Sequence, residues 1–262
     1  MKDVLVSIIM SVYNGEKYLK ESIESIINDN FQEWECIICN DNSTDNTKDI
    51  LNYYCKKDKR FKVINLNKNV GAAIARNIAL KESKGKYIAI LDSDDLNCKS
   101  RLEKQYLFLE KNKKYSFVGS LAYIFDDNGK WKQNSYTGEI TDINIAKGMP
   151  FIHSTLMARL EDIKEINFYP NYRRIQDYSM IMNLYSKNKG YILDEYLVEY
   201  RKDENNYKRR TFKSRIEEVY IRYVGYKKCK IPYYMRLYLF KPIIAGMIPS
   251  YIMKKYHKLK GA

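Results

Sequence analysis

Acidic residues follow two apolar runs of the sequence directly. Asp92 and Asp94 come after the run at 87–91, and Asp41 comes after the run at 34–39. Carboxylate oxygens suit Mg²⁺ or Mn²⁺, which proteins bind through one or two carboxylates together with substrate phosphates. A cation held there can neutralise charge on a departing diphosphate. The other interpretation of Asp92 and Asp94 is an acidic helix start, which the helix dipole favours.

Two of the polar positions allow both a structural and a chemical interpretation. Arg76 lies early in a helix that begins near Gly71, where it can meet a phosphate, although a solvated helical arginine is the commoner outcome. Asp41 can form an N-cap or Asx turn before a helix that starts near Ser43 and Thr44. Residue type alone leaves these alternatives open.

The elements that must position these residues alternate regularly over the first half of the chain. Apolar runs at 5–10, 34–39, 61–65 and 87–91 predict four strands, and helical patterns follow the first three of them. Repeated strand and helix units predict a mostly parallel sheet covered by helices on both faces. Ligands of such sheets lie beyond the carboxyl ends of the strands, which is where the acidic residues stand.

The second half has weaker patterns. No Pro-rich, Gly-rich or Ser-rich linker separates it from the first half, so we expect one domain over residues 1–212. We expect residues 213–262 to form a separate helical segment, with Ile216, Tyr220 and Tyr223 on one face and Arg222 off it. The other predicted elements are a helix at 100–109, a strand at 117–125, a helix at 176–187 and strands at 191–193 and 197–200.

Positive charge is concentrated at the C-terminal end. The chain has 46 Lys and Arg against 32 Asp and Glu, and residues 201–262 hold 17 of the basic residues but only 4 of the acidic ones. A basic helical segment rich in tyrosine can lie on an anionic membrane surface. The alternatives are helices that pack on the domain with a solvated face, or a surface that binds nucleic acid.

The cysteines and the apolar stretches exclude several classes of protein. Cys36 and Cys39 lie three apart on a predicted strand and therefore point to opposite faces, which argues against a metal or redox pair. The most apolar late stretch, 237–253, is interrupted by Lys241 and two prolines, so we expect no transmembrane helix. We also expect no signal peptide.

Four segments together resemble the family 2 glycosyltransferases of the GT-A fold: residues 7–14, 40–45, 71–77 and 85–95. The resemblance is dense over residues 4–110 and thinner to about residue 205. It implies an α/β protein with a Rossmann-like, mostly parallel central sheet, whose nucleotide-binding half covers residues 1–98 and whose acceptor half covers residues 99–212. It also implies inverting, metal-dependent sugar transfer, with a UDP-hexose as the expected donor and Mg²⁺ or Mn²⁺ as the cofactor.

The resemblance also implies roles for single residues. Tyr13 and Asp41 would hold the nucleobase, Asp92 would face the ribose, and Asp94 would bind the metal. The residues expected to contact the donor are Ser11, Tyr13, Asn14, Asp41, Arg76, Asp92 and Ser93.

The family's catalytic base stands at the start of a late helix, where this chain has Gln176 followed by Asp177. Gln176 replaces an acid that is usual there, and Asp177 is the expected base. A sugar hydroxyl is too weak an acid to ionise for a carboxylate with an ordinary pKa of about 3.9, so the proton must move late, as the new C–O bond forms. The alternative is an acidic first-turn residue that only stabilises the helix.

Further residues are expected near the acceptor or the diphosphate, each with a structural alternative. His153 and Gln176 can line the site, although His153 can equally be a buried, hydrogen-bonded histidine. Tyr200 and Arg201 resemble a late Tyr-Arg pair of the family and can meet the diphosphate, or they belong to the basic surface. Trp131 can stack on an acceptor sugar or pack as an ordinary aromatic.

These features predict a cytoplasmic glycosyltransferase, peripheral at the inner face of the membrane, that extends a glycan in surface polysaccharide or oligosaccharide assembly. A lipid-linked acceptor is expected. A basic nucleic-acid-binding protein is one alternative, but it leaves the acidic strand-end segments unexplained, so we expect no nucleic-acid partner. An inactive module that binds sugar nucleotides is the other, and Gln176 is the one feature that points to it.

Overall fold

The first part of the chain forms three strand and helix units and a fourth strand. The computed structural model describes residues 4–166, 169–170, 172, 175–202 and 212–247. The units predicted from the apolar runs are confirmed. They are β1 (Val6–Val12), α1 (Leu19–Ile27), β2 (Trp34–Asn40), α2 (Thr47–Lys57), β3 (Phe61–Asn65), α3 (Ala72–Lys81) and β4 (Tyr87–Ile90).

The second part adds strands and helices of mixed length. The predicted late strands at 191–193 and 197–200 are wrong as two elements, because one strand with shifts of register covers both. The elements are β5 (Leu96–Asn97), α4 (Arg101–Lys111), β6 (Tyr115–Asp126), β7 (Gly129–Lys132), β8 (Gly138–Glu139), α5 (Asp142–Lys147), η1 (His153–Thr155), β9 (Met157–Arg159), α6 (Leu160–Glu165), α7 (Gln176–Tyr185), β10 (Lys189–Arg201), α8 (Phe212–Lys228), η3 (Tyr233–Phe240) and α9 (Lys241–Met247).

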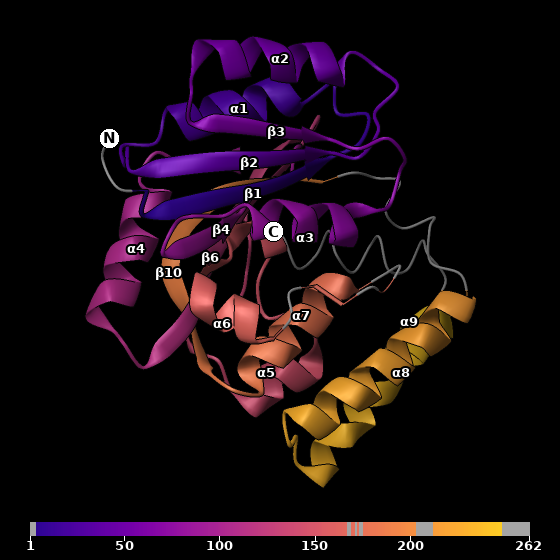
Figure 1. Cartoon of the computed structure of the whole chain (residues 1–262). Coiled ribbons are helices and arrows are strands. Elements are labelled where there is room, and N and C mark those ends of the chain that lie inside the picture. The colour runs from indigo at the N-terminus through magenta and orange to yellow at the C-terminus, as the bar shows by residue number, and fades with distance from the viewer. Residues whose placement is uncertain (1–3, 167–168, 171, 173–174, 203–211, 248–262) are drawn as a thin grey trace.

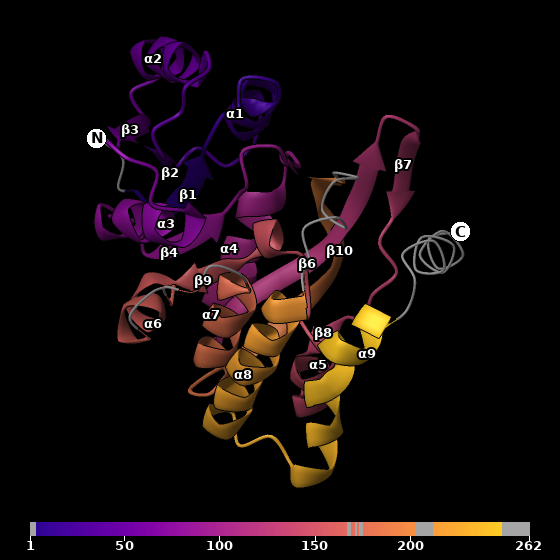
Figure 2. The same ribbon diagram turned by 90° about the vertical axis from the view of Figure 1, so that its right-hand side faces the viewer.

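One sheet contains strands from both parts, in the order β3-β2-β1-β4-β9-β6-β10-β5. The neighbours β3, β2, β1 and β4 are all parallel, as are β6 and β10. The antiparallel strand β9 joins these two parallel groups. The strand β7 pairs with β6 in a hairpin, which projects from the rest of the sheet in Figure 2. The predicted mostly parallel sheet is therefore confirmed.

Helices cover the two faces of the sheet and enclose separate cores. Side chains alternate along β1, so Ile8 packs against α1 and α2 while Ile9 packs against α3 on the other face. Figure 1 shows α1 and α2 above β1, β2 and β3, α3 beside β4, and α6 and α7 lower in the molecule. Cys36 and Cys39 lie in different cores, as predicted, and burial raises the pKa of the Cys39 thiol to about 11.

The helix α8 is buried through a different face from the one that the apolar pattern predicted. Ile216 and Tyr220 are exposed, whereas Ile221 and Arg222 are buried. Arg222 tolerates burial because its guanidinium donates to Glu218 Oε1 at 2.9 Å and to the carbonyl of Ala146 at 3.4 Å. None of the described helices is long and apolar enough to cross a bilayer.

Candidate active site

The loops that follow β1 and β2 are held together by hydrogen bonds. The Asn14 N–H donates to Ser43 Oγ at 3.0 Å, and the Thr44 N–H donates to Asn14 Oδ1 at 2.9 Å. Asn14 has a left-handed backbone, with φ of 51°. In this structure the Asn14 side chain therefore connects two loops. Tyr13 lies beside it with 52% of its surface exposed, and Ser11 is half-buried at the end of β1.

Asp41 is buried at the end of β2, and backbone amides occupy its carboxylate. Oδ1 accepts from the Val70 N–H at 2.7 Å and Oδ2 from the Gly71 N–H at 2.8 Å. Gly71 has φ of 89°, a conformation that favours glycine, and α3 begins at the next residue. The alternative of a cap before the helix near Ser43 is therefore wrong, because Asp41 supports the start of α3 instead.

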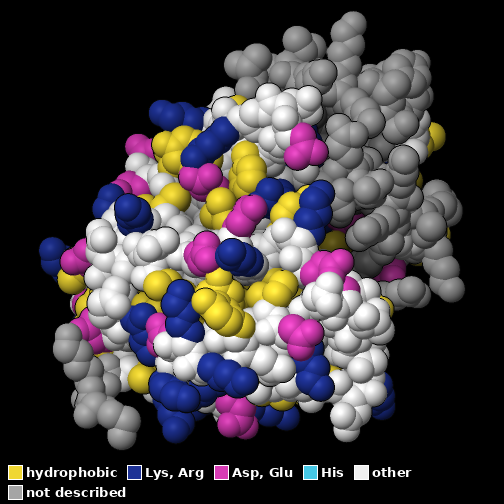
Figure 3. All heavy atoms as spheres, turned by 90° about the horizontal axis from the view of Figure 1, so that it is seen from above, with side chains coloured by type: hydrophobic (Ala, Val, Ile, Leu, Met, Phe, Trp, Pro, Cys, Tyr) yellow, Lys and Arg dark blue, Asp and Glu magenta, His cyan; other side chains and the backbone are white. Residues whose placement is uncertain are grey.

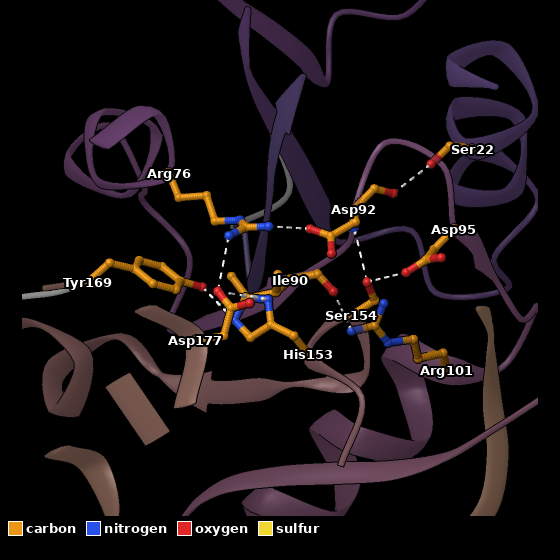
Figure 4. Close-up of polar contacts among 10 residues, drawn as sticks. All are labelled: Ser22, Arg76, Ile90, Asp92, Asp95, Arg101, His153, Ser154, Tyr169 and Asp177. Atoms are coloured by element: carbon orange, nitrogen blue, oxygen red, sulfur yellow. Dashed lines mark hydrogen bonds and ion pairs between the residues drawn. The ribbon is translucent and has the colours of Figure 1, made fainter. Parts of the chain in front are cut away.

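Arg76 joins two of the predicted site residues. Its Nη2 lies 2.5 Å from Asp92 Oδ1 and its Nη1 lies 3.2 Å from Asp177 Oδ1. Arg76 is buried in α3, while Asp92 follows β4 and Asp177 lies in the first turn of α7. Figure 4 shows the guanidinium between the two carboxylates. The fold thus brings Asp177 onto Arg76, which lies 101 positions earlier in the sequence.

The charge of Asp92 is set by two opposing effects. Burial raises the pKa of the Asp92 carboxyl, but the positive charge of Arg76, together with hydrogen bonds from Arg76 and Ser154, outweighs burial. The net effect lowers the pKa of Asp92 below its ordinary value. Asp92 is therefore an anionic acceptor, which can receive hydrogen bonds from hydroxyl groups.

The His153 ring, which pairs with Tyr169, lies close to the Asp177 carboxylate. The Tyr169 hydroxyl lies 2.8 Å from His153 Nε2, and His153 Nδ1 lies 3.8 Å from Asp177 Oδ1 (Figure 4). Burial lowers the pKa of His153, which favours the neutral ring. The Asn77 side-chain amide forms two hydrogen bonds with the backbone of Tyr169. Its Nδ2 donates to the Tyr169 carbonyl at 2.9 Å, and its Oδ1 accepts from the Tyr169 N–H at 2.8 Å.

The loop that carries Asp92, Ser93 and Asp94 is fixed by buried neighbours. The Asp92 N–H donates to Ser154 Oγ at 3.2 Å, and the Ser154 hydroxyl donates to Asp95 Oδ2. Asp95 Oδ1 accepts from the Arg201 N–H at 2.9 Å. The loop is therefore connected to η1 and to the end of β10, and Asp92, Ser93 and Asp94 remain half-buried.

Arg201 contacts this loop and the first turn of α1. Its Nε donates to the Asp94 carbonyl at 3.0 Å, its Nη2 donates to Glu21 Oε2 at 2.6 Å, and its guanidinium lies 4.0 Å from the centre of the Tyr18 ring. In this structure it supports the loop. Tyr200 precedes it on β10 and is half-buried.

Trp131 and Gln176 lie in different surroundings. Trp131 is on β7, paired with Ile124, and the Lys202 ammonium lies 5.2 Å from its ring centre. Gln176 begins α7, and its buried amide oxygen has no hydrogen-bond partner among the described residues. Ile175, directly before it, has φ of 48°, which is strained for a β-branched residue. The start of α7 is thus fixed in an unusual backbone conformation.

Asp94 has the chemistry that a divalent cation requires. It presents a half-buried carboxylate just beyond the end of β4. No cluster of three His, Cys, Asp or Glu residues suited to a metal occurs within the described part of the chain. One carboxylate together with diphosphate oxygens is a usual set of ligands for Mg²⁺, so Asp94 fits the expected Mg²⁺ or Mn²⁺.

Sequence reasoning missed three residues of this site. Tyr169 contacts His153, and Ser154 accepts a hydrogen bond from Asp92. Asn77 in turn forms a hydrogen bond with the backbone of Tyr169. Asn77 follows Arg76 at the end of the segment 71–77, and Ser154 follows His153. Both could therefore have been predicted, because each is adjacent in sequence to a candidate site residue. Tyr169 offered none, because only the fold brings it to His153.

Comparison with known proteins identifies relatives over nearly the whole chain. The family model described as Glycosyl transferase family 2 matches residues 7–167. EpsE of Bacillus subtilis (strain 168), named as a glycosyltransferase, is 36% identical over 258 residues, which cover 97% of this chain and 93% of that protein. TuaG of the same strain, named as a teichuronic acid biosynthesis glycosyltransferase, is 37% identical over 204 residues, with coverages of 77% and 81%.

Solved structures agree on the fold. The crystal structure of S. aureus TarS 1–349 in complex with UDP-GlcNAc aligns with a TM-score of 0.73 and 24% identity, over 86% of this chain and 66% of that chain. The complex of TarS 1–349 with UDP aligns with a TM-score of 0.69, over 84% of this chain and 65% of that chain. The chain thus spans about two thirds of the solved structures, and the GT-A prediction is confirmed. Since the family model covers more than half of the sequence and relatives align along its length, the chain belongs to glycosyl transferase family 2.

Proposed function

We propose that this protein transfers a hexose from a UDP-sugar to a hydroxyl of a glycan acceptor, with inversion at the anomeric carbon. The bridge from Asp92 through Arg76 to Asp177 is the observation that carries the proposal. It joins a carboxylate of the donor loop to the candidate base on a separate helix. Such an arrangement suits a reaction in which donor and acceptor meet beside the two carboxylates, on their solvent-accessible side.

The donor contacts are proposed from chemistry and position. The carboxylate oxygens of Asp41 retain lone pairs beyond their backbone partners, which can accept from an N–H of uracil. The exposed ring of Tyr13 can stack on the base, with Ser11 and Asn14 alongside. Asp92, which is anionic, accepts from the ribose hydroxyls, and Ser93 follows it. The UDP and UDP-GlcNAc in the TarS complexes support a uridine nucleotide here.

Asp94 is the proposed ligand of Mg²⁺ or Mn²⁺. When bound, such an ion supplies positive charge to a diphosphate leaving group. Arg201 positions Asp94, because its Nε donates to the Asp94 carbonyl and its backbone N–H donates to the Asp95 carboxylate. We propose that Arg201 and Tyr200 act on the diphosphate through this loop.

Asp177 is the proposed base. The Asp177 side chain is 33% exposed, so its carboxylate can reach an acceptor hydroxyl while Arg76 holds Oδ1. Oxygen attack on the anomeric carbon forms one C–O bond as the bond to the diphosphate breaks, and the acceptor proton passes to Asp177. Gln176 lies directly before Asp177 at the start of α7 and is proposed as a second acceptor contact. Trp131 is the proposed outer acceptor contact.

The acceptor and the location follow from charge and relatives. The name of TuaG, a teichuronic acid biosynthesis glycosyltransferase, supports a role in polysaccharide synthesis. We propose a lipid-linked glycan in surface polysaccharide assembly and a peripheral position at the inner face of the membrane, because residues 201–262 carry 17 Lys and Arg.

The test is nucleotide release from a panel of nucleotide sugars, with and without a chelator, in the presence of a glycan acceptor. We expect release from a UDP-hexose that is lost with the chelator and in Asp94→Asn. Donor binding without any transfer would support the inactive module instead. Tight, salt-dependent oligonucleotide binding without sugar-nucleotide binding would support the nucleic-acid alternative.

A further inference from the structure

A row of exposed apolar side chains runs along η3 and α9. We call it the C-terminal stripe, and its members are 53–80% exposed, which is unusual for large apolar residues in one row. The stripe consists of Tyr234, Leu237, Phe240, Ile244 and Met247.

The two helix types explain why these residues align. A 3₁₀ helix has three residues per turn, so Tyr234, Leu237 and Phe240 on η3 lie above one another. The helix α9 continues the row with Ile244 and Met247, four and seven residues after Phe240. The opposite side of η3 packs inward, because Leu239 is buried in the core and Met235 and Tyr238 pack against it. The stripe is therefore the outer face of an amphipathic element, beside α8 in Figures 1 and 2.

Along the sequence, the charge from the middle of α8 onward has one sign, although Glu217 and Glu218 lie earlier on α8. Residues 219–262 contain ten Lys and Arg and neither Asp nor Glu. Of these, Lys230 and Lys241 are exposed directly before η3 and at the start of α9, and Arg236 is half-buried within η3. The face that carries α1 and α2, in contrast, shows acidic and basic side chains intermixed (Figure 3).

We propose that the C-terminal stripe inserts into the interfacial layer of an anionic lipid bilayer and holds the enzyme on it. This inference rests on the proposed peripheral location and assigns the face that makes the contact. Basic side chains complement anionic headgroups, while the exposed Leu, Ile, Met and Phe side chains enter the acyl boundary. The exposed Lys230 ammonium can extend to the headgroups, while the Lys241 ammonium at the start of α9 donates to the Lys147 carbonyl at 2.6 Å.

Other occupants fit the same face less well. Nucleic acid would use the basic and aromatic residues but would leave Leu237, Ile244 and Met247 without a function. A second copy would bring two basic faces together at a cost in repulsion. A bilayer satisfies both the apolar row and the charge.

The test is flotation of the full-length protein with phosphatidylcholine vesicles, with and without phosphatidylglycerol. We expect binding that requires phosphatidylglycerol, and at least about tenfold weaker binding for Leu237→Glu with Ile244→Glu. The matched control is Leu107→Glu with Tyr53→Glu, since both residues are exposed apolar positions away from the stripe. The control pair should bind vesicles as the wild type does.

Several results would overturn the inference. They are vesicle binding by the stripe variant at wild-type strength, equal loss in the control variant, or a wild-type dimer that the stripe variant converts to a monomer. Calorimetric binding of UDP-sugar, measured on the same proteins, separates this inference from the proposed reaction. The stripe variant should bind UDP-sugar with wild-type affinity. If the wild-type protein binds vesicles but does not bind UDP-sugars, only the proposed function is rejected.

Discussion

Replacing Arg76 with methionine tests the bridge at the centre of the site. Methionine keeps much of the length and the apolar stem of arginine but removes the guanidinium. Asp92 and Asp177 then lose the cation that lies 2.5 Å and 3.2 Å from them. The change is expected to destabilise the fold and to weaken donor binding.

The magnitude follows from burial. The Arg76 side chain is 7% exposed, and the carboxylates of Asp92 and Asp177 are 29% and 33% exposed. Removing one partner of a fully buried pair costs about 3–5 kcal/mol. Since both carboxylates keep partial contact with water, we expect Arg76→Met to lower the free energy of unfolding by about 2–3 kcal/mol.

Asp92→Asn, in combination with Arg76→Met, separates lost charge pairing from lost packing. With the arginine gone, Asp92 is an unpaired, largely buried carboxylate, so its neutralisation should recover part of the lost stability. The double variant should therefore be at least about 1 kcal/mol more stable than the sum of the single changes predicts.

Urea unfolding gives these values, with Lys104→Met as the matched control. Lys104 pairs with Glu195 at the surface, where the two side chains are 44% and 41% exposed, and such pairs contribute about 0–1 kcal/mol. If Arg76→Met costs no more than Lys104→Met, or if the two site substitutions are additive, the electrostatic reasoning is refuted.

Three further substitutions test the surroundings of the site. Burial lowers the pKa of His153 below its ordinary value of 6.5. Below that pH, His153 is therefore protonated in the unfolded chain but remains neutral in the folded protein. The free energy of unfolding should therefore fall from pH 7 to pH 5, with a contribution from His153 of up to about 1.4 kcal/mol per pH unit. In urea unfolding at several pH values, the stability of His153→Gln should fall less steeply than that of the wild type. Parallel curves for the two proteins would contradict this. Tyr169→Phe should cost about 1–2 kcal/mol in the same assay, because His153 Nε2 loses its partner, and an unchanged midpoint would show that bond to be dispensable. Gly85→Ala should cost about 1–3 kcal/mol in thermal unfolding, because its Cβ would lie 2.6 Å from the Ser7 nitrogen, and wild-type stability would show that the strands can move apart.

The strand-end residues were predictable because local patterns fix them. Each apolar run is followed by a turn, and parallel strands bring their carboxyl ends to one edge, so the neighbourhood of Asp41 and Asp92 followed from order alone. The sheet beyond β4 was less predictable, because β9 pairs antiparallel with strands far away in sequence. The continuous strand β10 also escaped prediction, since its register shifts interrupt the alternation.

Side-chain partnerships were not predictable from residue type. Arg76 was expected at a phosphate or in solvent, but the fold buries it between two carboxylates. The burial of Arg222 in α8 reversed the expected helix face for the same reason, since a buried arginine depends on acceptors that come from other elements. Tyr169 reaches His153 through contacts that only the folded chain makes.

The rate of sugar transfer by Asp177→Asn, measured together with calorimetric donor binding, tests the central claim most directly. Asp49→Asn is the matched control, because Asp49 also lies in the first turn of a helix. We predict that Asp177→Asn keeps its donor affinity and loses transfer by roughly 10²–10⁴-fold, while Asp49→Asn changes neither. Transfer by Asp177→Asn at the rate of the control would contradict the assignment of Asp177 as the base.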